Sequence, residues 1–247
     1  MLAVSAAPPP RTGRVTLDTT ALYAKDGQKW GLGSSAAAAL LLCRFLLDTP
    51  ESPPPREDII AAALHTHRHF QNGLGSGYDI YTSAHGGAGL FTGGETPSWQ
   101  PISPPSGIQC YLLRGPAPVS SARAVQRYTQ WTGRARSSLL TEMDERVLHL
   151  STLLTSGAPS AEVLSEFAAL GTLGALIGDA IGVPARPLLP EGLGSDIPAG
   201  RRPGAAVKCL GAGDELALLL YQNGALTSGE LALLDNLVKE GRAKREN

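Results

Sequence analysis

The apolar residues of the chain recur with the spacing of amphipathic helices over several long stretches. This pattern predicts helices at residues 34–47, 57–70, 78–84, 122–131, 141–155, 160–181 and 228–245. Ser34 or Ser35 is the expected N-cap of the first helix. Basic residues end the last predicted helix, as the helix dipole favours.

Shorter apolar runs, bounded by glycine, proline and serine, predict strands. They lie at residues 15–22, 88–91, 100–102, 108–114, 205–210 and 215–221. Strands and helices do not alternate strictly, and the middle of the chain holds a block typical of antiparallel strands. This order predicts an α+β fold rather than repeated βαβ units. Gly171, Gly174 and Gly178 predict close packing of the helix that carries them.

The composition narrows the class of protein. Of the 247 residues, 43% are hydrophobic, which suits a globular core, and the net charge of -1 gives no field that favours nucleic acid or an anionic membrane. Three cysteines, odd in number and far apart, predict buried reduced thiols. The longest apolar run, residues 36–43, is too short for a bilayer, and no signal peptide is evident. We therefore expect a soluble cytoplasmic protein.

Residues 31–37, the glycine-serine loop, read Gly-Leu-Gly-Ser-Ser-Ala-Ala and lead into a predicted helix. Phosphate groups bind well to backbone N–H groups at a helix start, and glycine lets the backbone approach closely. The serine hydroxyls can reach a phosphate oxygen or a metal ion. The loop lacks the Gly-Lys-Ser/Thr of a P-loop and the third glycine of a dinucleotide fingerprint. An ordinary helix cap with a flexible lead-in is the alternative.

Two further glycine segments carry candidate chemistry. Residues 75–79, the aspartate turn, read Gly-Ser-Gly-Tyr-Asp and offer the carboxylate of Asp79 to an attacking hydroxyl. The alternative is an aspartate that caps the following helix. Residues 211–213, the C-terminal glycine loop, lie between two predicted strands and can present N–H groups to a ligand. An ordinary hairpin turn is the alternative there.

Taken in this order, the segments resemble the GHMP kinases, a superfamily that includes galactokinase, homoserine kinase, mevalonate kinase and phosphomevalonate kinase. The phosphomevalonate kinases carry Lys-x-Gly-Leu-Gly-Ser-Ser-Ala-Ala, and residues 29–37 read Lys-Trp-Gly-Leu-Gly-Ser-Ser-Ala-Ala. They also carry Gly-Ser-Gly-x-Asp followed by Gly-Gly, as at residues 75–79 and 86–87. Residues 15–23 and 65–71 resemble the segments that precede these two motifs, and the likeness extends to about residue 221.

The resemblance implies a two-lobed α+β fold with a ribosomal-S5-like N-terminal part, incomplete here, and a ferredoxin-like C-terminal part. We expect a flexible tail at residues 1–14, an ATP-binding domain at 15–105 and a C-terminal domain at 106–247. The implied activity is ATP- and Mg²⁺-dependent phosphoryl transfer to a small metabolite, most closely phosphomevalonate to diphosphomevalonate in the mevalonate (isoprenoid) pathway. The expected partner is this small acceptor, with no nucleic acid or membrane, and the chain is expected to be a monomer or homodimer.

The resemblance also implies roles for particular residues. Asp79 and Lys29 are the expected catalytic residues, and Ser34 and Ser35 the expected metal ligands. The expected cofactor-binding residues are Gly31, Leu32, Gly33, Ser34, Ser35 and Ala36. The expected substrate-binding residues are Ser76, Gly77, Ser120, Gly211, Ala212 and Gly213.

The sequence departs from the family pattern in three places. No Pro-Gly-Lys…Gly-Glu segment precedes Val15, the C-terminal glycine loop is two glycines short, and His67 stands where some relatives have a metal-binding glutamate. The alternative function is therefore an N-terminally truncated or non-catalytic relative that binds nucleotide or metabolite without turnover.

Two clusters leave alternatives of their own. Ser120, Ser121 and Arg123 are either an anion site or the N-cap of a helix. The histidines at 65, 67, 69 and 85 are either a metal site or a solvated, capping cluster.

Overall fold

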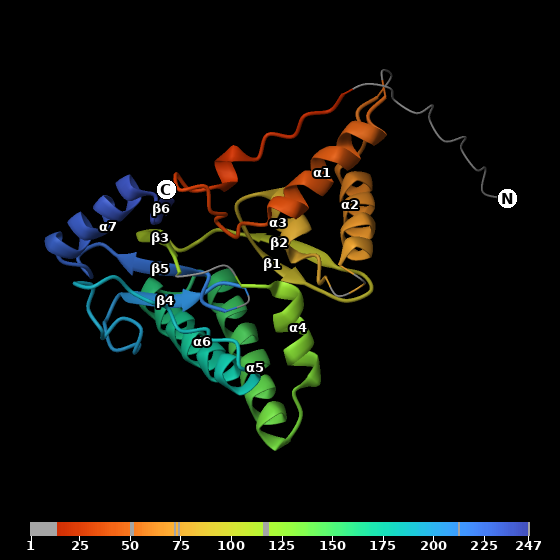
Figure 1. The fold of residues 1–247 in the computed structure, drawn as a ribbon. Helices are drawn as coiled ribbons and strands as arrows, with labels where there is room; N and C mark the ends of the chain where they lie inside the picture. The colour runs from red at the N-terminus through yellow and green to blue at the C-terminus, as the bar shows by residue number, and fades with distance from the viewer. Residues whose placement is uncertain are drawn as a thin grey trace.

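A computed structural model describes residues 14–49, 52–71, 73, 75–115, 119–211 and 213–246 of the chain. The described part is α+β, as the sequence predicts (Figure 1). Its elements are a 3₁₀ turn Thr20–Leu22, α1 Ser34–Leu47, α2 Arg56–Phe70, α3 Tyr78–His85, β1 Ala88–Thr92, β2 Ser98–Ile102, β3 Ile108–Arg114, α4 Ser121–Gln130, α5 Arg134–Ser156, α6 Ser160–Ile181, β4 Ala205–Cys209, β5 Leu216–Gln222, α7 Ser228–Glu240 and β6 Ala243–Glu246.

The C-terminal half is built on an antiparallel sheet with the strand order β4-β5-β3-β6. Side chains alternate between its two faces, as the pleat requires. Tyr111 and Leu219 lie opposite each other in the register of β3 and β5, and both belong to the core that α7 covers through Leu234 and Leu237. Leu112 and Leu216 belong to a different buried cluster, described below.

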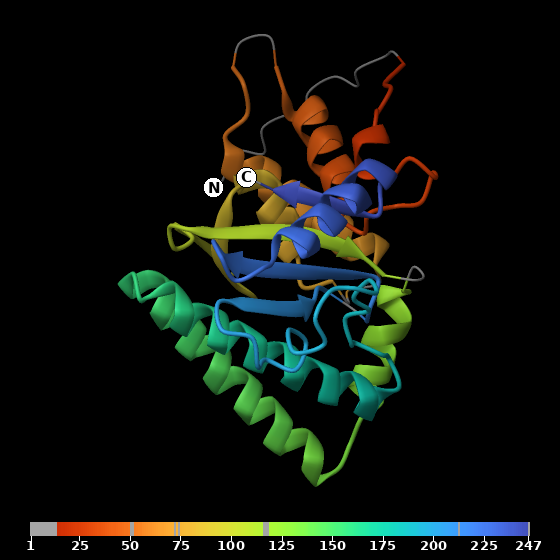
Figure 2. The same ribbon diagram turned by 90° about the vertical axis from the view of Figure 1, so that its left-hand side faces the viewer.

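Helices α5 and α6 lie against each other, and α6 packs on β4 (Figures 1 and 2). A Cβ atom on Gly171 would lie 2.8 Å from the Val207 carbonyl oxygen, and one on Gly178 2.5 Å from that of Val183. The predicted close packing is therefore confirmed at these two glycines. By length and composition alone α6 could cross a membrane, but one such helix is weak evidence, and here it lies between α5 and β4.

The N-terminal half gathers α1, α2 and α3 around a second core. Ala36 and Leu40 of α1 meet Ala63 and Leu64 of α2, and Ile80 of α3 is fully buried among them. The hairpin of β1 and β2 is paired antiparallel and lies beside α3. Its aromatic rings stack on that helix, with the His85 and Trp99 ring centroids 5.6 Å apart.

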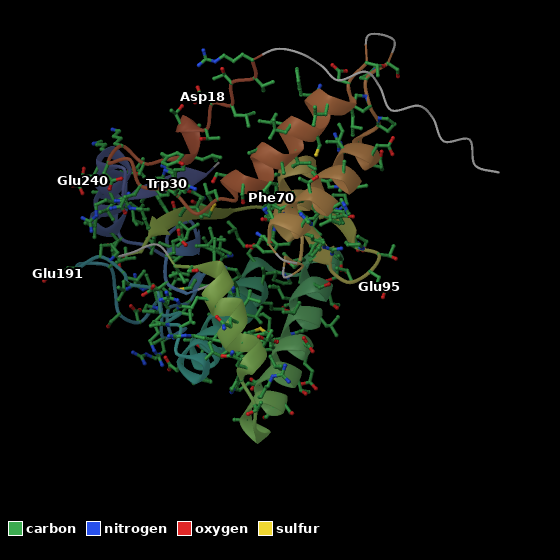
Figure 3. All side chains as sticks on the ribbon, turned by 45° about the vertical axis from the view of Figure 1, so that its right-hand side comes forward. Asp18, Trp30, Phe70, Glu95, Glu191 and Glu240 are labelled. Atoms are coloured by element: carbon green, nitrogen blue, oxygen red, sulfur yellow. The ribbon has the colours of Figure 1, made fainter. Side chains whose placement is uncertain are left out.

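Trp30 joins the two halves. Its side chain is only 4% exposed and packs with Ala24, Leu112 and Leu216, so that it lies against the sheet directly before the glycine-serine loop. Figure 3 shows Trp30 inside the molecule, whereas Phe70 at the end of α2 lies on the surface. The turn before Trp30 is held as well, because Arg114 donates two hydrogen bonds to the carboxylate of Asp26 at 2.8 and 2.6 Å.

Most predicted elements are confirmed, but the strand at residues 15–22 is wrong. The Asp18 carboxylate accepts hydrogen bonds from the N–H of Thr20 at 3.0 Å and from its hydroxyl at 2.6 Å. This local bonding closes a turn, and a 3₁₀ turn follows at Thr20–Leu22.

Three predictions about helix ends are also wrong. The helix predicted at 141–155 begins earlier, at Arg134. The N-cap of α1 is Gly33, in the left-handed region at φ 72°, and no side chain caps the helix. The last helix ends at Glu240 rather than at 245, because Gly241 at φ 75° turns the chain and the next residues pair with β3 as strand β6. The cysteines form no disulfide, and Cys110 is half-buried while the other two are buried.

An ion-pair network fastens α7 to the long connection before β4. Arg202 donates to Glu230 at 2.6 Å and to Asp196 at 2.8 Å, and the N–H of Gly194 donates to Glu230 at 3.1 Å. Glu230 also completes a capping box with Thr227. Burial alone would raise the pKa of Glu230, but the hydrogen bonds from Thr227, Arg202 and Gly194 outweigh it and lower the pKa to about 2.

The depressed pKa makes Glu230 a source of stability that acid removes. Its contribution is complete above the ordinary value of 4.5 and is lost as the pH falls toward about 2. We expect Glu230→Gln to lower the free energy of unfolding by about 2 kcal/mol at neutral pH, and to lower it much less near the acid end of that window. Urea unfolding at both pH values measures the difference.

Glu240→Gln is the matched control. Glu240 also lies on α7 beside an arginine, Arg242 at 3.5 Å, but its side chain is exposed, so the pair adds little stability. Equal losses for the two variants, or a loss for Glu230→Gln that does not depend on pH, would contradict the assignment.

Candidate functional site

The start of α1 is open to an anion. The first i to i−4 hydrogen bond of α1 runs from the N–H of Ala37 to the carbonyl oxygen of Gly33, at 3.1 Å. The N–H groups of Ser34, Ser35 and Ala36 precede it and have no partner within the helix. Gly31 and Gly33 have φ values of 71° and 72°, which glycine adopts without strain. With the positive end of the helix dipole, these N–H groups form a cradle suited to phosphate.

The carboxylate of Asp79 lies beside this cradle. A Cβ atom on Gly33 would be 3.5 Å from the Asp79 Cβ, so the loop and the α3 start are in contact. Asp79 accepts a hydrogen bond from the N–H of Ile80 at 3.0 Å. Gly77, at φ 90°, precedes it as the N-cap, and a Cβ there would collide with Leu64. Gly77 therefore lets α3 pack closely on α2, and the first turn of α3 faces α1.

His67 of α2 connects the two helix starts. Its Nε2 atom lies 3.1 Å from the Ser35 hydroxyl oxygen and 3.7 Å from Asp79 Oδ2, and the residue is 4% exposed. In a Ser-His-Asp triad the serine and the carboxylate contact opposite ring nitrogens. Here both oxygen atoms face Nε2, and Nδ1 has no hydrogen-bond partner. The arrangement is therefore not that of a Ser-His-Asp triad.

The C-terminal glycine loop lies near the start of α3. A Cβ on Gly211 would lie 3.8 Å from the Tyr78 hydroxyl, and both Gly211 and Gly213 have positive φ values, 65° and 83°. Ala212, which the sequence also singled out, lies outside the described residues. Partial burial and, after it, the charge of Asp79 raise the pKa of Tyr78, so its hydroxyl remains a proton donor near the loop.

Sequence reasoning missed Glu215 as part of this site. Its carboxylate accepts a hydrogen bond from the N–H of Val119 at 3.2 Å. Its Oε1 atom also lies 3.1 Å from the point where a Cβ on Gly31 would be. The side chain thus bonds to the segment after β3 and lies close to the backbone of the glycine-serine loop. An acidic residue just after a glycine turn carries no signal of this in the sequence, because the contact joins residues far apart along the chain.

Other candidate residues lie apart from this group. Lys29 is exposed, with Nζ 5.9 Å from the centre of the Tyr23 ring, and none of its described contacts joins it to Asp79. Ser76 is exposed, and its hydroxyl accepts from the N–H of Tyr78 at 3.5 Å. The Ser120 hydroxyl accepts from the N–H of Arg123 at 3.4 Å, which confirms N-capping of α4.

The oxygen donors here suit Mg²⁺, but the histidine does not. Mg²⁺ takes oxygen ligands, which the Ser34 and Ser35 hydroxyls and the Asp79 carboxylate can supply. The imidazole of His67 adds a nitrogen that Mg²⁺ does not favour. The histidine cluster itself is divided, because His65 and His69 are exposed while His67 is buried. Among the described residues no group of three or more His, Cys, Asp or Glu side chains is placed to hold a metal ion.

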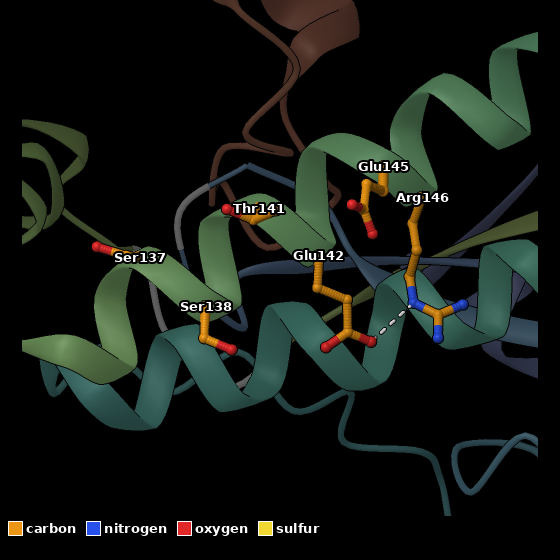
Figure 4. Close-up of a pocket in the computed structure, with 6 residues that line it drawn as sticks. All are labelled: Ser137, Ser138, Thr141, Glu142, Glu145 and Arg146. Atoms are coloured by element: carbon orange, nitrogen blue, oxygen red, sulfur yellow. Dashed lines mark hydrogen bonds and ion pairs between the residues drawn. The ribbon is translucent and has the colours of Figure 1, made fainter.

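A polar hollow elsewhere has none of these features. It has a volume of about 630 Å³ and is lined by side chains of α5 alone (Figure 4). They are Ser137, Ser138, Thr141, Glu142, Glu145 and Arg146. Glu142 and Arg146 form an ion pair at 3.0 Å one helical turn apart, so the hollow is a solvated helix face.

Comparison with known proteins gives a family match for one segment of the chain. The family model for the GHMP kinases N terminal domain matches residues 21–87, which include the glycine-serine loop, His67 and Asp79. No curated protein matches the chain.

Solved structures share the fold. A Lin0012 protein from Listeria innocua is 20% identical, with a TM-score of 0.70 over 92% of this chain and 68% of that one. Streptococcus pneumoniae phosphomevalonate kinase, in complex with phosphomevalonate and AMPPNP, is 17% identical with a TM-score of 0.61, over 90% and 71%. L. major mevalonate kinase, in complex with R-mevalonate, is 20% identical with a TM-score of 0.58, over 86% and 64%.

The chain thus spans about two thirds of the length of these structures. At 17–20% identity, these matches show a shared fold and no more. The family match covers the segment that holds the candidate cradle and carboxylate. Residues 21–87 therefore match the GHMP kinases N terminal domain, and the fold of the chain is shared with solved structures that include mevalonate kinase and phosphomevalonate kinase.

Proposed function

We propose that the protein is an ATP-dependent kinase that phosphorylates a small metabolite. The observation that supports this most is the contact between the open start of α1 and Asp79, because it sets a phosphate cradle beside a carboxylate. Phosphoryl transfer depends mainly on positioning and on neutralising charge. A site with few reactive side chains is sufficient for that chemistry.

The proposed cofactor is ATP with Mg²⁺, and ATP supplies the phosphoryl group when bound. The backbone N–H groups of Ser34, Ser35 and Ala36 would hold its phosphates, with Gly31, Leu32 and Gly33 shaping the approach. The hydroxyls of Ser34 and Ser35 would be the metal ligands. The use of AMPPNP in the S. pneumoniae structure supports the choice of nucleotide.

Asp79 is the proposed catalytic carboxylate. It would accept a hydrogen bond from the acceptor group and orient that oxygen toward the phosphate cradle. His67, 3.7 Å from Asp79 and buried, would hold the carboxylate in place. Lys29 is proposed to neutralise an acceptor phosphate, for which its exposed position leaves the side chain free to move.

The proposed acceptor is phosphomevalonate, converted to diphosphomevalonate in isoprenoid synthesis. The support is the loop at residues 29–37, which reads as in phosphomevalonate kinases, and the phosphomevalonate complex of the S. pneumoniae enzyme. The acceptor would contact Ser76, Gly77, Ser120, Gly211, Ala212 and Gly213. We further propose an ATP-binding domain at residues 15–105, a C-terminal domain at 106–247, a cytoplasmic location and a monomer or homodimer.

The second candidate function is binding of nucleotide or metabolite without turnover. The exposed Lys29 favours it, since among the described contacts only His67 brings a basic side chain to Asp79. The two functions differ in turnover and agree in nucleotide binding, which allows them to be separated.

Replacement of Asp79 tests the carboxylate. We expect Asp79→Asn to lower turnover by about a thousandfold while the dissociation constant for ATP changes less than about threefold, because the cradle is backbone. A coupled ADP-release assay and calorimetry measure the two quantities. Asp144→Asn, an exposed aspartate on α5, is the control. Full turnover in Asp79→Asn would show that another carboxylate is responsible.

Two glycine variants test the cradle. Gly33→Ala and Gly27→Ala both force alanine into the left-handed region, at φ 72° and 79°, so each should cost about 1–2 kcal/mol of stability. Only the alanine at 33 meets Asp79, since nothing lies within 4 Å of a Cβ on Gly27. We expect ATP binding to weaken about tenfold in Gly33→Ala and to stay within about twofold in Gly27→Ala. Equal binding by the two variants would place the nucleotide elsewhere.

An acceptor panel separates kinase from binding protein. The ADP-release assay is run with phosphomevalonate, mevalonate and homoserine, and we expect the highest turnover with phosphomevalonate. ATP binding without turnover on any of them would favour the non-catalytic function.

A further inference from the structure

An apolar cavity of about 540 Å³ lies among α4, α5, α6 and the end of β4. This volume is typical of pockets for small molecules. Apolar side chains from all three helices line it, among them Ala124, Val125, Met143, Val147, Leu170 and Ile177. The glycine-serine loop does not contribute to the lining, but Tyr78, Gly211 and Gly213 do, so the cavity adjoins the proposed acceptor site.

Glycines on α6 explain why the cavity is open. Gly171 and Gly178 are pressed against the backbone carbonyls of Val207 and Val183. Gly174, between them on the same helix, also lines the cavity, yet nothing lies within 4 Å of a Cβ placed there. Close packing therefore requires the outer two glycines, and the middle one leaves space that no side chain of the described residues fills.

Lys208 is the one charged residue among those that line the cavity. It comes from β4, and its Nζ atom donates to the carbonyl of Cys209 at 3.0 Å. It takes part in none of the ion pairs between described residues. Burial lowers the pKa of Lys208, which means that the ammonium has lost part of its hydration. An anionic group beside it would recover that lost stabilisation.

We propose that this cavity binds a small amphiphile, with an apolar body against α4, α5 and α6 and one anionic group at Lys208. A nucleoside triphosphate does not fit, because it would bring several negative charges to a wall with a single cation. A neutral hydrocarbon would leave the ammonium without an anionic partner. Because Gly211 and Gly213 belong to its lining and are proposed to contact the acceptor, the inference rests on the proposed function in the position of this site. Its test is separate, since binding is measured without nucleotide and does not depend on turnover.

Decanoate is the probe, because it joins an apolar chain to one carboxylate. Its binding to the full chain is measured by calorimetry without nucleotide, together with that of 1-decanol, which has the same chain and no charge. Gly174→Leu fills the cavity, and Gly229→Leu is its control, at an exposed helical glycine of α7. Lys208→Met removes the charge and keeps the apolar stem.

We expect decanoate affinity to fall at least about tenfold in Gly174→Leu and to stay within about twofold in Gly229→Leu. In Lys208→Met we expect the affinity for decanoate to fall about tenfold, while the affinity for 1-decanol changes less than about threefold. Thermal unfolding verifies that each variant is folded. If Lys208→Met does not fold, the ratio of decanoate to decanol affinity in the unaltered chain gives the test, with at least about a tenfold preference expected.

Three results would overturn the proposal. They are no binding of decanoate to the unaltered chain, equal binding by the Gly174→Leu and Gly229→Leu variants, and equal affinity for decanoate and decanol. Self-association that Gly174→Leu abolishes and decanoate leaves unchanged would also overturn it, since the cavity would then belong to a contact between two copies of the chain.

Discussion

The candidate site depends on the burial of Trp30. The indole packs on Leu112 and Leu216 of the sheet, and the chain that follows it at once becomes the glycine-serine loop. The Asp26–Arg114 pair and a hydrogen bond from Lys25 Nζ to the Lys239 carbonyl at 2.9 Å fix the turn before it. The loop thus begins from a rigid point on the C-terminal sheet and ends in the first turn of α1, in the N-terminal core. Its N–H groups are held in place before any ligand arrives, which lowers the entropic cost of binding one.

The geometry of the candidate site is set by the N-terminal ends of two helices. Two helices, α1 and α3, begin at glycines with positive φ values, and neither receives a side-chain cap. Their starts meet at Gly33 and Asp79, with His67 buried between Ser35 and Asp79. Positive dipole ends, free N–H groups and one carboxylate therefore share a small region. Such a region attracts phosphate to one side and an acceptor oxygen to the other.

The sequence predicts the helices well and the site in part. Helix 34–47, the aspartate turn and strands β3, β4 and β5 follow from local patterns, because apolar periodicity and glycine positions act over short distances. Strand β6 does not, since its residues were predicted as the end of a helix. The strand predicted at 15–22 is absent because Thr20 donates two hydrogen bonds to the Asp18 carboxylate, which closes a turn. The apolar pattern there is weak and does not take this local bonding into account. Glu215 and the role of His67 could not be predicted, since their contacts join residues 12 or more positions apart. The sequence predicts close packing at Gly174 as at Gly171 and Gly178. Only the tertiary structure shows that a Cβ on Gly174 would meet open space.

The central claim is that the backbone at the start of α1 binds the phosphates of ATP. The most direct measurement is a titration of the ¹⁵N-labelled chain with ATP and Mg²⁺, followed by the amide signals in NMR spectra. The account predicts that the amides of Ser34, Ser35 and Ala36 shift most, and that those of the α5 hollow at Glu142 and Glu145 do not move. ATP binding that leaves the three α1 amides unshifted would contradict it.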